Sequence, residues 1–193
     1  MKAANVSQIV FVSFYADQED NPFTMSPYYA YAPRRLAGSG LQYAVVKNAL
    51  YADPLVPYLP ELIERQALIY PVGDAAMSFI AQNDSAEAIA TVAVKPELRG
   101  AGQVYTVTQN EAYTMPQLGK VMTAVTSRTI GYQPVSVAEF GRIYAAEGDG
   151  DELGSMYAGG AKGELGLVTD DFKTITGRNP EDMTHFLKTR YQR

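Results

Sequence analysis

One stretch of the sequence, Gly40 to Tyr51 (GLQYAVVKNALY), constrains the fold more than any other. Its centre is rich in β-branched and aromatic residues and follows a Ser-Gly helix stop, so it predicts a helix followed by a buried strand. Lys47, Asn48 and Tyr51 come just past the carboxyl end of that strand. Ligands bind at this end of open parallel sheets, because strand ends and loops form a crevice there. The stretch therefore predicts an α/β fold with a binding site at its strand end.

Composition narrows the class of protein. The chain has 193 residues, of which 47% are hydrophobic, which is enough for one core or for a core plus a small subdomain. Its net charge of -5 and the absence of a Lys/Arg run argue against a nucleic-acid partner. The chain has no cysteine, and its carboxylates and single histidine do not have metal-ligand spacing, so thiol chemistry is excluded and no metal is expected. No apolar run has the length of a membrane span, and no signal peptide is recognisable, so the cytoplasm is the expected location.

Local patterns predict further elements. Ile9–Val12 is a continuous apolar run of the kind found in strands buried on both faces. Residues 103–108 alternate and are β-branched, which is typical of a strand. The sequence DSAE at 84–87 predicts a capping box that opens a helix, and Thr114 with Gln117 predicts another. Glycine dominates residues 148–166, which predicts a mobile loop or a lid.

Six strings carry a resemblance to a known family. In chain order they are IVFVSF (9–14), LAGSGLQYAVVKNALY (36–51), NDSAEAIATV (83–92), GQVYTVT (102–108), TMPQL (114–118) and TGRNP (176–180). Together they resemble the NmrA-like branch of the atypical short-chain dehydrogenase/reductase superfamily, which includes bacterial NADPH-quinone oxidoreductases. The resemblance implies a truncated Rossmann-type parallel sheet with a C-terminal α-rich substrate subdomain. Residues 1–110 would form the partial NAD(P)-binding domain and residues 111–193 the substrate-binding subdomain.

The sequence departs from the family at the cofactor's pyrophosphate site. Members of the family begin with a strand and a G-x-x-G-x-x-G turn, whose backbone amides hold the pyrophosphate. The glycines at 100–102 and 148–154 do not reproduce this pattern, and the second group carries three carboxylates. We therefore expect the chain to match only the C-terminal two thirds of the family fold, without the Gly-rich dinucleotide-binding segment.

The resemblance also implies site residues. Asn48 and Tyr51 would be catalytic, and NADP or NAD would be the cofactor. The residues implied to contact that cofactor are Ser13, Phe14, Tyr15, Lys47, Asn48, Ala49 and Leu50. The family's Tyr-x-x-x-Lys pair is matched only by Tyr31 and Arg35, and arginine cannot act as the lysine does in a proton relay.

Two classes of function remain open from the sequence. The first is an NAD(P)H-dependent oxidoreductase of the quinone or small carbonyl reductase type, inactive if the missing segment is required. The alternative is a non-enzymatic NmrA-like module that senses dinucleotide or binds a protein; an inactive remnant that still folds is a third reading. The apolar edge of Ile9–Val12 predicts a homodimer, because an unpaired strand edge is a template for association.

Overall fold

The computed structural model describes residues 6–191 of the chain. The strands are β1 (Gln8–Phe14), β2 (Gln42–Asn48), β3 (Leu50–Tyr51), β4 (Ala67–Leu68), β5 (Ala76–Ile80), β6 (Ala101–Val107), β7 (Ala112–Thr114) and β8 (Gly131–Tyr132). The α-helices are α1 (Ser26–Ala37), α2 (Leu55–Arg65), α3 (Gln82–Val94), α4 (Met115–Thr126), α5 (Val137–Ile143), α6 (Gly150–Ala161), α7 (Asp171–Thr176) and α8 (Met183–Tyr191). Two short 3-10 helices are η2 (Pro96–Leu98) and η3 (Ala145–Glu147).

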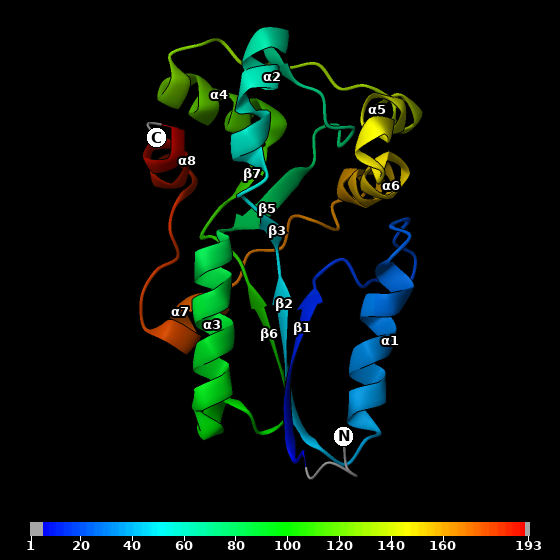
Figure 1. The fold of residues 1–193 in the computed structure, drawn as a ribbon, viewed down its shortest axis with the longest axis vertical. Coiled ribbons are helices and arrows are strands. Elements are labelled where there is room, and N and C mark those ends of the chain that lie inside the picture. Colours follow the sequence, from blue (N-terminus) through cyan, green and yellow to red (C-terminus); the bar gives the residue numbers. More distant parts are fainter. Residues whose placement is uncertain (1–5, 192–193) are drawn as a thin grey trace.

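The main sheet confirms the predicted α/β fold with a parallel sheet. Its three strands are parallel in the order β1-β2-β6. The central strand β2 carries Ala44, Val45 and Val46, which are fully buried, so the apolar centre of the 40–51 stretch forms the middle of the sheet. Helices α1 and α3 lie on opposite faces of this sheet (Figure 1). The carboxyl ends of β1 and β2 lie side by side, with Phe14 opposite Asn48.

Five short strands continue the structure beyond the main sheet. Strand β5 pairs with β3 in parallel and with β7 in antiparallel orientation, and β4 pairs with β8. Helices α2, α4, α5, α6 and α8 gather around this end of the molecule (Figure 1). None of the helices in the described part of the chain is long and apolar enough to cross a membrane.

Strand β1 differs from its prediction. Ile9–Val12 was expected to be buried on both faces, which is wrong. The unpaired edge expected for the same run is present, because among the described residues β1 pairs with β2 alone. Ile9 is only half-buried, and Val12 is 43% exposed. The run is apolar because one face of β1 packs on the core. The strand edge away from β2 has no pairing strand within residues 6–191. Homodimerisation through this edge stays a prediction.

One of the two predicted capping boxes is present. The Thr114 hydroxyl oxygen accepts a hydrogen bond from the backbone N–H of Gln117, and the Gln117 side-chain oxygen accepts one from the backbone N–H of Thr114. Helix α4 therefore begins as predicted. The helix predicted from DSAE is present, but the predicted cap is wrong, since α3 begins earlier, at Gln82, and has no side-chain cap. Asp84 is instead inside the first turn, where its buried carboxylate accepts bonds from Arg178 and from the backbone N–H of Glu181. A tertiary contact has replaced the local cap.

The glycine-rich segment 148–166 is not a mobile loop or lid over most of its length. Residues Gly150–Ala161 form helix α6, which packs against α5. A side chain at Gly150 would overlap the carbonyl oxygen of Gly141, so glycine is required where the two helices come together. The composition that suggested flexibility reflects close helix packing.

Candidate active site

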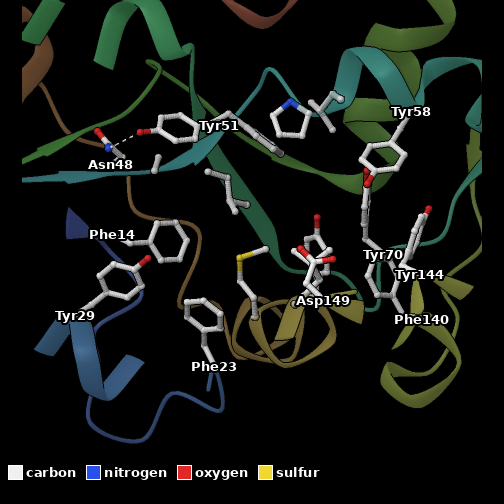
Figure 2. A pocket seen from close by; sticks show the side chains of 18 of the residues that line it. Phe14, Phe23, Tyr29, Asn48, Tyr51, Tyr58, Tyr70, Phe140, Tyr144 and Asp149 are labelled. Atoms are coloured by element: carbon white, nitrogen blue, oxygen red, sulfur yellow. Dashed lines mark hydrogen bonds between the residues drawn. The ribbon is translucent and has the colours of Figure 1, made fainter. Parts of the chain in front are cut away.

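A cavity of about 510 Å³ lies at the carboxyl ends of β1 and β2. Helices α2, α5 and α6 close it on the other side, so its lining combines sheet ends with helix faces. Half of the lining residues are aromatic. Figure 2 shows Phe14, Asn48 and Tyr51 at one end, and Tyr58 and Tyr144 at the other. The cavity therefore has a sheet end and an aromatic end.

Ser13 places an unpartnered hydroxyl at the sheet end. It is the second-last residue of β1, where strand alternation turns its side chain inward, and it is only 4% exposed. Its Oγ has no hydrogen-bond partner within the described chain. A buried hydroxyl without a partner is costly, so this atom is suited to bind a polar ligand atom. Phe14 follows it and packs edge-on against Phe23, with the two ring centroids 5.8 Å apart.

Asn48 is held in one orientation by two hydrogen bonds. The Ser85 hydroxyl donates to its Oδ1 over 2.8 Å, and its Nδ2 donates to the Tyr51 hydroxyl oxygen over 2.9 Å. Both Asn48 and Ser85 are buried, whereas Tyr51 is 37% exposed. Because the Tyr51 oxygen accepts from the amide, its own hydrogen is free to be donated to a ligand in the cavity.

Two of the residues implied by the resemblance do not line the cavity. Tyr15 is buried, and its hydroxyl donates to the carbonyl oxygen of Leu165 over 2.6 Å, so it serves the core. Lys47 forms a salt bridge with Asp17, with Nζ and Oδ2 2.5 Å apart. Alternation along β2 explains Lys47, because its neighbour Asn48 lines the cavity, whereas Tyr15 lies beyond the end of β1. All the other residues implied by the resemblance do line the cavity: Ser13, Phe14, Asn48, Ala49, Leu50 and Tyr51.

The Tyr31 and Arg35 pair lies on α1, outside the lining of the cavity. The guanidinium of Arg35 lies over the Tyr31 ring, 6.0 Å from its centroid, and Tyr31 is 59% exposed. The two residues form a surface contact on the helix.

The aromatic end was not predicted from the sequence. Its members are Tyr58 of α2, Tyr70, Phe140 of α5, Tyr144 at the C-cap of α5, and Tyr157 of α6. Phe140 lies at the centre, with its ring centroid 4.7 Å from that of Tyr144 and 5.0 Å from that of Tyr157. The four-residue spacing of Phe140 and Tyr144 puts both on one helix face, which is a detectable signal, but it is equally typical of ordinary core packing.

Carboxylates surround this aromatic end. Asp149 lines the cavity, Glu147 accepts a hydrogen bond from the Tyr58 hydroxyl, and Glu61 accepts one from the Tyr144 hydroxyl over 3.3 Å. The bond to Glu147, with a smaller effect of burial, raises the pKa of Tyr58 to about 12. Burial, followed by the charge of Glu61, raises the pKa of Tyr144 above its usual value. Both phenols are therefore neutral hydrogen-bond donors at physiological pH.

Comparison with known proteins finds sequence similarity to two curated reductases. The chain matches no protein-family model. It is 29% identical to quinone oxidoreductase 2 of Escherichia coli over 179 residues, which are 91% of this chain and 60% of that protein. The chain is homologous to quinone oxidoreductase 2. It is also 21% identical to the NAD(P)H azoreductase of Xenophilus azovorans over 191 residues, which are 97% of this chain and 66% of that protein. The chain thus spans less than two thirds of the length of the first of these relatives.

Solved structures show the same fold. A Staphylococcus aureus protein described as a nucleoside-diphosphate-sugar epimerase superposes with a TM-score of 0.93 at 39% identity, over 97% of this chain and 66% of that one. Quinone oxidoreductase 2 of Escherichia coli in complex with NADPH gives a TM-score of 0.87 at 24% identity, over 97% of this chain and 67% of that one. The chain accordingly has the same α/β fold with a parallel sheet as these proteins.

Proposed function

We propose that this chain forms the acceptor-binding part of an NAD(P)H-dependent reductase that acts on quinones or small aromatic carbonyl compounds. The observation that carries the proposal is the arrangement at the sheet end of the cavity. There an unpartnered Ser13 hydroxyl and a Tyr51 hydroxyl oriented by Asn48 border the same aromatic-lined space. The homology to quinone oxidoreductase 2, described as NADPH-dependent in its structure, supports the choice of reaction.

The residues present fit the nicotinamide end of such a cofactor. The buried Ser13 Oγ lacks a partner and can bond a carboxamide, and Ala49 and Leu50 offer an apolar surface beside it. Bound NAD(P)H supplies a hydride to the acceptor. The aromatic walls orient a planar acceptor and exclude water from the cavity.

Tyr51 is proposed as the proton donor. Reduction by a hydride leaves negative charge on an acceptor oxygen, which a positioned hydroxyl stabilises by donating its hydrogen. Asn48 holds the Tyr51 oxygen through its Nδ2, so the phenol is oriented to donate and not to accept. In this proposal Tyr51 touches the reacting oxygen, and Asn48, which lines the same cavity, positions Tyr51.

The division at residue 110 stays part of the proposal. The cavity takes its lining from residues before that point, such as Phe79, and from residues after it, such as Phe140. An acceptor bound there would lie between the proposed cofactor-binding and substrate-binding parts. The cytoplasmic location predicted from the sequence likewise stays a prediction.

Calorimetric titration with NADPH and NADH, followed by an assay of 1,4-benzoquinone reduction at 340 nm, tests the proposal. We expect micromolar binding of one dinucleotide and turnover that falls about 100-fold in Tyr51→Phe with little change in dinucleotide affinity. No dinucleotide binding by a folded sample would contradict reduction by this chain alone. Binding without turnover of any quinone or aldehyde would favour the dinucleotide-sensing alternative.

A further inference from the structure

The aromatic end of the cavity has a charge pattern that the proposed quinone chemistry does not need. Quinones are neutral, and a reductase that only binds neutral rings requires apolar walls. Here Asp149 is the charged residue among those lining the cavity, and no Lys, Arg or His contributes to the lining within residues 6–191. Figure 2 shows Asp149 beside the space that faces Tyr70 and Phe140.

The neighbouring carboxylates strengthen this pattern. Glu147 binds the Tyr58 hydroxyl, and within the described part of the chain neither Glu147 nor Asp149 takes part in a salt bridge. Glu61 is different, because its Oε1 lies 2.7 Å from Nε of Arg65, which offsets its charge. Two solvent-exposed carboxylates that form no salt bridge within residues 6–191 therefore lie at this end.

The rings add an attraction of the same sign. The faces of tyrosine and phenylalanine rings carry negative electrostatic potential, and cations bind over them. Tyr58 and Tyr144 meet edge to face, with centroids 5.7 Å apart and an interplanar angle of 79°. Each phenol that donates to a carboxylate also leaves its ring richer in electrons.

We propose that the aromatic end of the cavity, formed by Tyr58, Tyr70, Phe140, Tyr144 and Tyr157 with Asp149, selects aromatic ligands that carry a positive charge. The proposal adds an acceptor class to the proposed function. That these ligands are reduced rests on the proposed function, whereas the preference for binding cations does not. The cationic group lies against the rings and Asp149, and the reducible part of the molecule extends toward Tyr51.

A matched pair of small ligands isolates the charge. (3-Hydroxyphenyl)trimethylammonium and 3-tert-butylphenol have nearly the same shape and differ in charge. Their dissociation constants for the purified 193-residue chain can be measured by calorimetry or by ligand-observed NMR, without any cofactor. A cation–π contact reinforced by carboxylates corresponds to a preference of about five- to thirty-fold for the cation. Equal binding, or tighter binding of the neutral phenol, would overturn the proposal.

Variants test the source of the preference. Asp149→Asn and Glu147→Gln should each reduce the preference at least threefold, with the affinity for 3-tert-butylphenol unchanged. Glu97→Gln, at an exposed carboxylate on η2 outside the cavity lining, removes the same charge and should leave the preference intact. If all three variants lower it equally, overall charge and not this site attracts the cation, and the proposal is wrong.

The same two ligands, together with the dinucleotide and quinone assays, distinguish failure of this proposal from failure of the proposed reductase function. Cation-selective binding by a chain that neither binds dinucleotide nor reduces quinones would uphold the aromatic site and reject the reductase. Quinone turnover with no preference for the cationic ligand would do the reverse.

Discussion

The hydroxyl of Ser85 on α3 donates to Oδ1 of Asn48 at the end of β2, over 2.8 Å. This contact joins residues 37 positions apart and decides which way the Asn48 amide faces. With Oδ1 turned toward Ser85, only Nδ2 is left to meet the Tyr51 hydroxyl. A serine that does not line the cavity thereby sets the direction in which Tyr51 can donate its proton.

Ser85→Ala should impair turnover more than binding. The substitution leaves a buried amide oxygen without its donor and releases the orientation of the Asn48 side chain. We expect kcat for quinone reduction to fall about tenfold, KM for the quinone to change less than twofold, and stability to fall by about 1–3 kcal/mol. Steady-state kinetics and urea unfolding measure these effects.

A second serine provides the control for this variant. Ser7 is exposed, and Ser7→Ala should change neither kcat nor the midpoint of unfolding. Ser85→Thr keeps a hydroxyl and should recover part of kcat. Equal loss of activity in the Ala and Thr variants would show that packing, and not the hydrogen bond, is responsible.

The pKa of Tyr58 should depend on Glu147. The bond to Glu147 raises that pKa from 10.0 to about 12, so its contribution to stability is complete below pH 10 and is lost as pH rises through about 12. Glu147→Gln should move the titration midpoint of Tyr58 back toward 10.0. NMR of the chain labelled with ¹³Cζ-tyrosine resolves the shift. Glu139→Gln, which removes a carboxylate paired with Arg142, should leave it unchanged.

Gly150→Ala should destabilise the contact between α5 and α6. A methyl group at this position meets the carbonyl oxygen of Gly141 and backbone atoms of Tyr144 and Ala145, which cannot move aside independently. We expect a loss of about 2 kcal/mol in the free energy of unfolding. Gly38→Ala, where the nearest atom is 3.9 Å away and φ is -81°, should be neutral or slightly stabilising by the same measurement. Similar melting temperatures for the two variants would contradict this account.

Arg178 should matter more for stability than an exposed arginine. Its Nη2 lies 2.5 Å from Oδ1 of Asp84, whose side chain is only 6% exposed, so removing the cation leaves a buried carboxylate without its charge partner. Arg178→Met should lower the free energy of unfolding by about 2 kcal/mol. This is less than the loss on breaking a fully buried ion pair, because the Arg178 side chain is about half-exposed. Arg142→Met, at a side chain that is 74% exposed, should cost less than about 0.5 kcal/mol. Chemical unfolding of both variants decides the comparison.

Local patterns in the sequence were sufficient to predict strands of the main sheet. The apolar centre of the 40–51 stretch has to be buried, and it forms the middle strand β2, while strand β6 covers the alternating residues 103–108 almost completely. The cap at Thr114 is equally local, because donor and acceptor are three residues apart. The location of the site followed from the same strand, since its end carries Asn48 and places Tyr51 in the cavity.

Tertiary contacts account for what the sequence could not show. Asp84 has the sequence of a helix cap, but its partner Arg178 is 94 positions away, and no local pattern reveals that distance. Glycines that permit helix packing have the same composition as glycines that permit motion, which is why α6 was missed. The aromatic end is assembled from α2, α5, α6 and the segment around Tyr70, so its members become neighbours only after the chain has folded.

The division of the cavity between sheet and helices gives its two ends different freedom to vary. Ser13 and Asn48 are fixed by strand register and by Ser85, so a change there disturbs the core of the sheet. Phe140 and Tyr157 lie on α5 and α6, and Tyr144 is the C-cap of α5; these two helices pack mainly on each other. Substitutions in this helical pair can alter which molecule is accepted while the groups that would act on it keep their positions. Under the proposed function, the end that binds the acceptor can therefore change in sequence without moving Ser13, Asn48 or Tyr51.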